Sequence, residues 1–342
     1  LVAVWLSQNL SPLGLALGFA FFLLEGISTY IAGTAYLSLI ADLTSEKERG
    51  QATGVVWTLL MVGIIVTGIG TGLILKDYSF DAFVTLTLAG AATAAALSAL
   101  ALVRQEPRSR VEAAALTPPP GFRESLRLLV RSSQSRWFAG FLLLAMFSYF
   151  MQDVILEPFG GEVFGLSAAQ TARFNSYMGV GVILGMLAGG FWLIPRFGKP
   201  RITALGCWLQ AGSFALLAYA SAAGQAGWLS AAITLLGLGA GFFTVGGVAM
   251  MMDMTSAEHT GLFVGAWTLV QALAKGPAAI VGGALQTAFV NVGATAAQAY
   301  AGVFALEAVG IALSIFFLSR VGVQVFQQQV APLGQVVAEA MD

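Results

Sequence analysis

The chain has 342 residues, of which 58% are hydrophobic and 10% are charged, and its formal net charge is −1. Soluble domains carry about a quarter charged residues, so this composition excludes an ordinary soluble protein, and it offers no basic excess for nucleic acid. One cysteine excludes an intrachain disulfide, and one histidine argues against a metal site built from cysteine and histidine.

Long apolar runs recur along the chain and predict membrane-spanning helices, because lipid offers no partner to an unpaired backbone group. About 20 apolar residues cross roughly 30 Å of hydrocarbon. We expect an all-α integral membrane protein with nine spans, at residues 13–40, 51–75, 80–103, 137–157, 172–195, 201–221, 227–252, 261–288 and 298–319. The break between the sixth and seventh depends only on the segment SAAGQAG. An apolar stub at residues 1–7 without a starting methionine predicts that further helices precede it.

Thirteen of the sixteen lysine and arginine residues lie in alternate connections, at residues 42–50, 104–136 and 196–201 and at Arg320. By the positive-inside rule these connections are cytoplasmic, and nine spans then place the C-terminus on the same side. The predicted parts are an incomplete N-terminal bundle at 1–103, a cytoplasmic linker at 104–136, a six-helix bundle at 137–320 and a cytoplasmic tail at 321–342.

A sequence repeat relates the two halves. The segment ADLTSEKERG at residues 41–50 aligns with MDMTSAEHTG at 252–261, so that Asp42 falls on Asp253 and Gly50 falls on Gly261. Both copies lie in connections on the basic side, so the two halves have parallel topology. Six spans in the second half and three in the first predict an intact protein of about twelve helices in two pseudo-repeated bundles.

The repeated loop combines helix capping with charge. Ser45 with Glu48, and Thr255 with Glu258, have the spacing of a capping box, and acid near a helix N-terminus suits the helix dipole. The alternative interpretation is a latch between helix bundles. The loop residues assigned to these roles are Asp42, Glu46, Glu48, Arg49, Gly50, Asp253 and Glu258.

The parallel halves, the loop from Asp42 to Gly50 and the turn GFWLIPRFGKPR at residues 190–201 resemble the major facilitator superfamily. The family usually has an acidic residue just before the arginine of that turn, whereas this chain has Pro195, which argues against the usual charge latch and ordinary carrier cycling. The resemblance implies that the spans at 51–75 and 172–195 meet between the halves. Both contain small residues that allow close backbone approach, namely Gly54, Gly181, Gly185 and Gly189.

Ionisable residues inside the predicted spans are candidates for function, because charge is costly in hydrocarbon. They are Glu25, Asp153, Glu157, Lys275 and Glu307. Asp153 and Glu157, four residues apart, are expected on one helical face, with Pro158 ending the helix. Such a pair would serve a proton-coupled carrier or a docking site for a partner. Lys275 is a candidate to neutralise Glu25. The sequence contains no nucleophile with a nearby base, so we expect no enzyme.

Two longer segments, FMQDVILEPFGGEVFGLS at residues 150–167 and LTSEKERGQATGVVWTLLMVG at 43–63, resemble the PucC, or bacteriochlorophyll delivery (LhaA-like), family within that superfamily. The resemblance covers the whole chain. It implies a protein of a photosynthetic membrane that helps to assemble light-harvesting complexes, by handling (bacterio)chlorophyll or by chaperoning antenna polypeptides. The alternative functions are a proton-coupled permease for a small solute and, less favoured because the spans lack histidine, a structural antenna subunit.

The contact or gating element peculiar to this family is expected between residues 152 and 164. Its candidate residues are Gln152, Asp153, Glu157, Pro158, Gly160, Gly161 and Glu162. Because no predicted span contains histidine, any pigment is expected to be held transiently. Its magnesium would then be bound by water, a backbone carbonyl or an oxygen-bearing side chain such as Glu307 or Gln286.

Overall fold

A computed structural model describes residues 12–45, 48–74, 79–102, 132–171, 173–255 and 260–326. Within these residues every regular element is helical, and each of the nine predicted spans has a helical counterpart. The long helices are α2 (Pro12–Leu43), α3 (Arg49–Ile74), α4 (Phe80–Leu102), α7 (Ser133–Phe150), α10 (Arg173–Leu187), α12 (Lys199–Ala223), α13 (Leu229–Asp253), α14 (Thr260–Asn291) and α15 (Ala296–Ser319). The short segments are η1 (Met151–Val154), α8 (Leu156–Phe164), α9 (Ala168–Thr171), η2 (Ala188–Leu193), α11 (Ile194–Phe197) and η3 (Ala226–Trp228).

The weakest predicted boundary, at residues 221–227, is confirmed. Helix α12 ends at Ala223 and is capped by Gly224, whose φ of 64° is the left-handed conformation that glycine adopts at helix C-termini. Helix η3 follows, and α13 begins at Leu229. The uncharged run between residues 202 and 252 therefore does divide into two spans.

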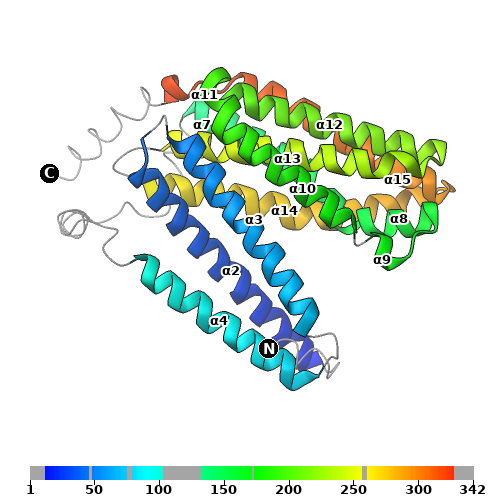
Figure 1. Ribbon diagram of the computed structural model, residues 1–342. Coiled ribbons are helices and arrows are strands. Elements are labelled where there is room, and N and C mark those ends of the chain that lie inside the picture. Colours follow the sequence, from blue (N-terminus) through cyan, green and yellow to red (C-terminus); the bar gives the residue numbers. More distant parts are fainter. Residues whose placement is uncertain are drawn as a thin grey trace. The chain divides into compact units, whose positions relative to one another are not determined.

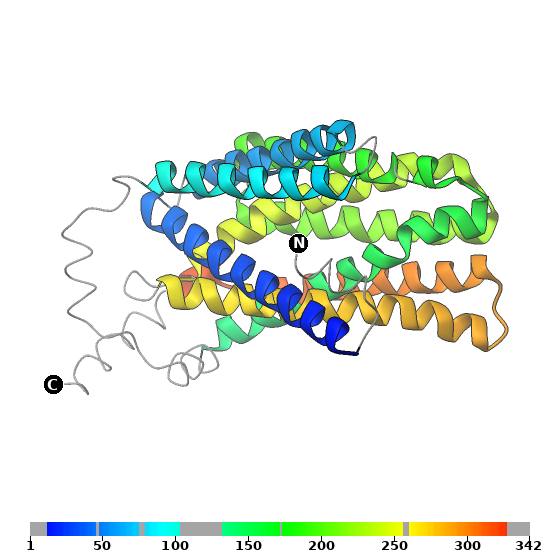
Figure 2. The same ribbon diagram turned by 90° about the horizontal axis from the view of Figure 1, so that it is seen from below.

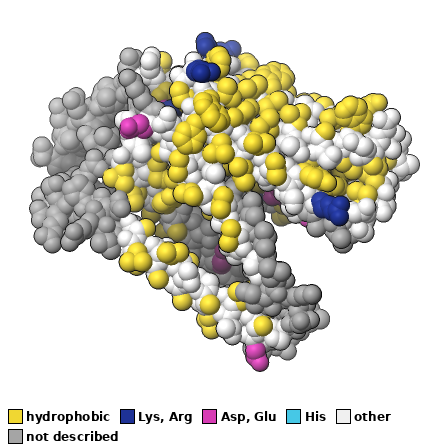
Figure 3. All heavy atoms as spheres, in the orientation of Figure 1, with side chains coloured by type: hydrophobic (Ala, Val, Ile, Leu, Met, Phe, Trp, Pro, Cys, Tyr) yellow, Lys and Arg dark blue, Asp and Glu magenta, His cyan; other side chains and the backbone are white. Residues whose placement is uncertain are grey.

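Eight stretches of the described residues are long and apolar enough to cross a membrane, from Ala16–Ile40 to Ala296–Ser319. Helix α3, whose side chains are only partly described, is not among the eight. Figure 3 shows hydrophobic side chains spread over the visible face of the larger compact unit of the chain, Gly33–Met61 with Leu126–Asp342. Its Lys and Arg side chains gather near the end of α11 and the start of α10. An apolar belt between charged ends is the pattern of a multi-pass membrane protein.

Two compact units share the chain. Leu1–Ala32 with Val62–Ser125 form the first unit, and Gly33–Met61 with Leu126–Asp342 form the second. Helices α2 and α3 therefore each belong partly to both units, which differs from the sequence boundary placed at residue 103. Most of the predicted linker lies outside the described residues, which resume at Ser132.

The helices of the second unit run alongside one another in both ribbon views (Figures 1 and 2). Helix α13 packs on α10 and α12, α12 packs on α15, and α7 packs on α14 and α15. Aromatic rings fill the centre, where Phe304 lies 4.9 Å from Phe159 and 6.3 Å from Phe214 between ring centroids. Since lipid tails are as apolar as these side chains, close packing rather than water exclusion stabilises such a bundle.

Glycines bring the helix backbones into contact, as predicted. A Cβ at Gly181 of α10 would clash with the carbonyl oxygen of Thr234, and a Cβ at Gly237 of α13 would clash with that of Met178. A Cβ at Gly54 of α3 would lie 3.4 Å from Cα of Gly190 in η2. The spans at 51–75 and 172–195 therefore do meet, while the face of α10 that carries Gly181 packs on α13.

The first residues of the predicted tail pack on the second unit. The Gly322 amide donates to Oε1 of Gln134 (2.7 Å), and the fully buried ring of Phe326 lies 5.4 Å from the ring of Phe263. Residues 321–326 are therefore part of the packed bundle rather than a free extension. The remaining residues of that tail lie outside the described part of the chain.

Candidate functional site: a charged cluster at the break in α7

Helix α7 stops at Phe150 and is followed by the 3₁₀ segment η1, Ile155 and then α8. Glycine on the neighbouring helix permits this break, since a Cβ at Gly282 of α14 would clash with the carbonyl oxygen of Met151. Pro158 lies in the first turn of α8, where its missing N–H removes no helical hydrogen bond. The expectation that Pro158 ends the helix was therefore wrong.

Asp153 lies in η1, and it interacts electrostatically with both other members of the charged cluster, Lys275 and Glu307. Its Oδ1 accepts a hydrogen bond from Nε2 of the buried Gln152 (2.7 Å), and the charges of Lys275 on α14 and Glu307 on α15 lie close enough to interact with it. Nζ of Lys275 also lies 4.6 Å from the ring centroid of Phe150, within the range of a cation–π contact. The electrostatic effects of Lys275 and Glu307 thus both reach Asp153.

Glu307 is the most enclosed of the three. Its side chain on α15 is fully buried, and neither carboxyl oxygen has a hydrogen-bond partner among the described residues. Asp153, by contrast, is exposed. A buried carboxyl group without a donor is unusual, because an unpaired charge in a low dielectric is strongly disfavoured.

The acidic residues of α8 have partners of their own. Oε1 of Glu157 accepts a hydrogen bond from Nδ2 of Asn175 (2.9 Å), and Oε2 of Glu162 accepts one from the hydroxyl of Tyr300 (3.1 Å). The break at η1 places Asp153 and Glu157 in different elements, and both side chains are exposed. The expectation that they share one helical face stays a prediction. No signal in the sequence pointed to Asn175 or Tyr300.

The two candidate glycines of α8 differ in their surroundings. A Cβ at Gly160 would lie 2.7 Å from Cγ2 of Thr171 and 2.8 Å from Cε2 of Phe174, so this glycine is required for packing. Gly161 has room for a side chain, with only the Leu166 carbonyl oxygen near at 3.7 Å. Both glycines lie in the helix, and the left-handed residue that ends α8 is Gly165 (φ 66°). Gly160 and Gly161 are therefore part of a regular helix.

Glu25 and Gln286 are the remaining candidates within the predicted spans. Glu25 belongs to the first unit, is exposed, and accepts a hydrogen bond from the hydroxyl of Thr29 (3.1 Å). Its pairing with Lys275 stays a prediction. Gln286 is half-buried on α14, and its Oε1 accepts a long hydrogen bond (3.5 Å) from the neighbouring Thr287 hydroxyl.

The first copy of the loop motif forms one half of the predicted capping box. Oε2 of Glu48 accepts hydrogen bonds from the Ser45 hydroxyl (2.6 Å) and the Ser45 amide (3.3 Å), just before α3 begins. These donors hold the pKa of Glu48 below its ordinary value. Glu46 and Glu258 lie outside the described residues, as do the side chains of Asp42 and Arg49, while Gly50 lies in the first turn of α3.

The second copy of the motif forms an ion pair. The carboxylate of Asp253, at the end of α13, accepts a hydrogen bond from the ammonium of Lys199 at the start of α12. The basic turn at residues 196–201 was the sequence signal for such a partner, although Pro195 argued against the usual latch. This pair joins two helices of one unit, so it is not a latch between helix bundles.

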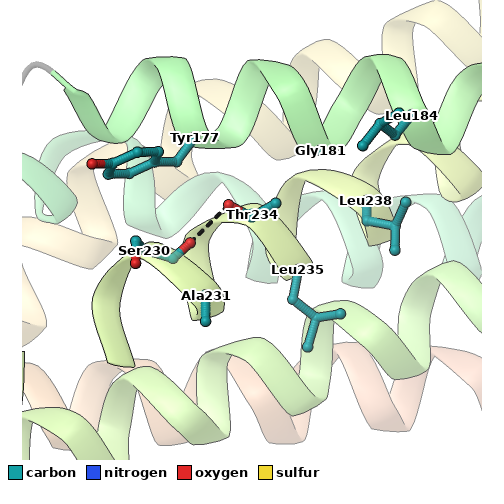
Figure 4. A pocket seen from close by; sticks show the side chains of 8 residues that line it. All are labelled: Tyr177, Gly181, Leu184, Ser230, Ala231, Thr234, Leu235 and Leu238. Atoms are coloured by element: carbon teal, nitrogen blue, oxygen red, sulfur yellow. Dashed lines mark hydrogen bonds between the residues drawn. The ribbon is translucent and has the colours of Figure 1, made fainter. Parts of the chain in front are cut away.

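A groove of about 480 Å³ lies between α10 and α13, and no motif in the sequence pointed to it. Figure 4 shows the side chains that line it, which are Tyr177, Gly181, Leu184, Ser230, Ala231, Thr234, Leu235 and Leu238. The Thr234 hydroxyl donates to the Ser230 carbonyl oxygen (2.8 Å). The groove is therefore mainly apolar, and none of these eight residues is charged.

Comparisons with known proteins show which family and which fold these features represent. The sequence matches the family model described as PUCC protein over residues 3–326. "Protein PucC" of Rhodobacter capsulatus is 28% identical over 313 residues, which cover 88% of this chain and 68% of that protein. The "Bacteriochlorophyll synthase 44.5 kDa chain", also of Rhodobacter capsulatus, is 32% identical over 269 residues, 76% of this chain and 62% of that one. The chain thus spans about two thirds of the length of these relatives.

The fold is also similar to that of a solved transporter. The crystal structure of the human organic anion transporter MFSD10 (TETRAN) aligns with a TM-score of 0.64 at 19% sequence identity, covering 83% of this chain and 67% of that one. This similarity concerns the fold alone, and it confirms the predicted major facilitator superfamily architecture. Since the family model covers nearly all of the sequence, the chain belongs to the PUCC protein family.

Proposed function

We propose that this protein is an assembly factor for light-harvesting complexes in a photosynthetic membrane, with its C-terminus in the cytoplasm. It delivers or handles (bacterio)chlorophyll, chaperones antenna polypeptides, or does both, and it has no enzymatic activity of its own. The observation that carries this proposal is the family match over residues 3–326. The relative named as a bacteriochlorophyll synthase chain supports a connection with the pigment.

Residues 152–164 are the proposed contact with the antenna polypeptide. The acidic side chains Asp153, Glu157 and Glu162 are exposed, whereas Gln152 and Gly160 are buried and fix the segment to the bundle. Exposed acids on a rigid support can recognise a basic or hydrogen-bonding segment of a partner. Pro158 and the 3₁₀ segment η1 set the direction in which these acids point.

A bound pigment would bring a magnesium ion that an oxygen-bearing side chain could hold, and the two candidate residues differ in how well they fit it. Glu307 is fully enclosed by packed helices, so its carboxyl group does not fit a macrocycle. Gln286 fits better, because its side chain is half-buried on α14 and its amide oxygen has only a long hydrogen bond within the chain. The proposed transient ligand is therefore Gln286, water or a backbone carbonyl, and not Glu307.

Co-purification tests this function. The protein is purified from pigment-replete and pigment-free membranes, and bound pigment and antenna polypeptides are measured. The D153A/E157A variant is expected to remain in the membrane but to lose the antenna polypeptides. D81A, which removes an exposed acid from the first turn of α4, serves as the control and should retain them. Normal antenna levels in the double variant reject the contact, and absence of both pigment and antenna from the wild type rejects the function.

A proton-coupled permease for a small solute is the second candidate. The observation that favours it is the cluster of Asp153, Lys275 and Glu307 inside a bundle with a transporter fold. Reconstituted vesicles would then accumulate a defined solute when a proton gradient is applied, and K275Q or E25Q would abolish uptake. Unchanged uptake in both variants contradicts this candidate.

A further inference from the structure

We propose that Glu307 is a proton-binding site in the second unit, and that Asp153 and Lys275 set how readily it binds the proton. This inference concerns neither pigment nor antenna polypeptides, so it stands or falls independently of the proposed function.

The first observation is the surroundings of the carboxyl group. Glu307 is fully buried, and no hydrogen-bond donor among the residues that the structure describes reaches either of its oxygens. Burying a carboxylate in such a place removes its hydration without supplying hydrogen-bond donors. This costs far more free energy than burying the neutral acid. The carboxyl group is therefore stable in this packing when it carries a proton.

A second buried polar atom lies at the same level of the bundle. Helices α12 and α15 are antiparallel neighbours, with the Ser221 hydroxyl donating to the Ala297 carbonyl oxygen (2.7 Å) and Phe214 stacked on Phe304. Counting along both helices from either pair brings Glu307 level with Ala211 of α12. The fully buried hydroxyl of Ser213, two residues further along α12, also has no hydrogen-bond partner among the described residues. Each of these two adjoining helices therefore buries an unsatisfied polar side chain in this part of the bundle.

The charged groups that face this site come from two elements. Asp153 of η1 acts on Glu307 directly, and Lys275 of α14 acts on Asp153. Tyr149 on α7 and Cys207 on α12 are titratable but neutral at ordinary pH. On α8 the carboxylates of Glu157 and Glu162 are bound by Asn175 and Tyr300, and Tyr300 itself belongs to α15.

These charges explain how proton occupancy could be coupled to the rest of the bundle. When Glu307 is neutral, the positive charge of Lys275 offsets the negative charge of Asp153. An ionised Glu307 repels the carboxylate of Asp153, whose charge Lys275 offsets. Losing the proton therefore changes the balance of charge at η1, where Met151 packs on Gly282 of α14.

A proton is the ligand that fits the available space. Both oxygens are enclosed, so a larger ligand would need the helices to separate, while a proton needs no room. Among the described residues, no group of three histidine, cysteine or acidic side chains could hold a metal ion. The site is thus suited to a proton rather than to a metal ion.

Infrared difference spectroscopy of the full-length protein in lipid vesicles, recorded as a function of pH, tests the proposal. The wild type should show the carbonyl band of a protonated carboxylic acid, which E307Q removes. E162Q, which changes an exposed carboxylate bound to Tyr300, should leave the band in place and is the matched control. A band that persists in E307Q, or that is absent from the wild type at every pH, overturns the proposal.

Two further variants test the neighbours while keeping Glu307 itself. D153N removes a negative charge, so the band should disappear at lower pH, and K275Q removes a positive charge, so the band should persist to higher pH. These opposite shifts decide the question even if E307Q does not insert correctly. Shifts in the same direction, no shift, or an equal response to sodium ions at fixed pH would each overturn the assignment.

Discussion

The ammonium group of Lys199, which opens α12, is paired with the carboxylate of Asp253, which ends α13. The pair joins the basic turn after α11 to the second copy of the repeated loop. Their side chains are only 14% and 8% exposed, so solvent screens the interaction weakly. The helix ends on this face of the second unit are therefore tied together by charge.

Breaking that pair should destabilise the protein. K199A removes the ammonium group that is paired with a nearly buried carboxylate, which costs on the order of 3 kcal/mol. Thermal unfolding in detergent should show a lower apparent Tm for K199A and for D253A, with the double variant losing less than the sum of the two. R196A, on the exposed part of the same turn, is the control and should behave as the wild type. Additive losses would show that the two residues act independently.

The contact between α10 and α13 should not tolerate even one extra carbon atom. G181A places a Cβ against the Thr234 carbonyl oxygen, and overpacking of this kind costs about 1–3 kcal/mol. The apparent Tm of G181A should fall. G179A, two residues earlier on the same helix, meets nothing within 4 Å and should leave the Tm unchanged or slightly raised. Equal effects of the two substitutions would mean that helix propensity, not packing, decides the outcome.

The loop before α3 should depend on pH through Glu48. Hydrogen bonds from Ser45 lower its pKa in the folded state. Their contribution is therefore present above the unfolded-state pKa, about 4.3, and is lost as the pH falls through the lower folded-state value. In S45A the pKa of Glu48 should rise toward its ordinary value, as followed by carbon-13 NMR with E48Q for assignment. T44A removes a hydroxyl that bonds to the Ile40 carbonyl oxygen instead, and it should leave this pKa unchanged.

Residues just after α15 should contribute to stability. Phe326 is fully buried and packs edge-on against Phe263, so F326A should cost about 3 kcal/mol through the cavity that it leaves. The expected readout is a lower apparent Tm in detergent. V325A, whose side chain is 44% exposed, should change it little. If F326A matched V325A, the packing of residues 321–326 would contribute nothing to stability.

Hydrophobic patterning was sufficient to place the helices, including α12 and α13 on either side of Gly224. It was not sufficient around η1, because the single span predicted at residues 137–157 covers a change from α-helix to 3₁₀ helix and back to α-helix. That change depends on Gly282, more than a hundred residues away, whose missing side chain lets α14 approach the Met151 carbonyl oxygen. The groove between α10 and α13 was missed for a similar reason, since Gly181 and Thr234 meet only in the fold.

The sequence by itself determined the spans, the repeat and the helix-capping loop, because lipid requires each backbone group to be satisfied within its own helix and capping is a local interaction. Only the tertiary structure decided that Asp253 pairs with Lys199, that Glu157 turns to Asn175, and that Glu307 is enclosed beside Asp153. Which charges meet inside a bundle depends on how the helices are rotated against one another. That rotation is fixed by contacts between residues far apart in the chain.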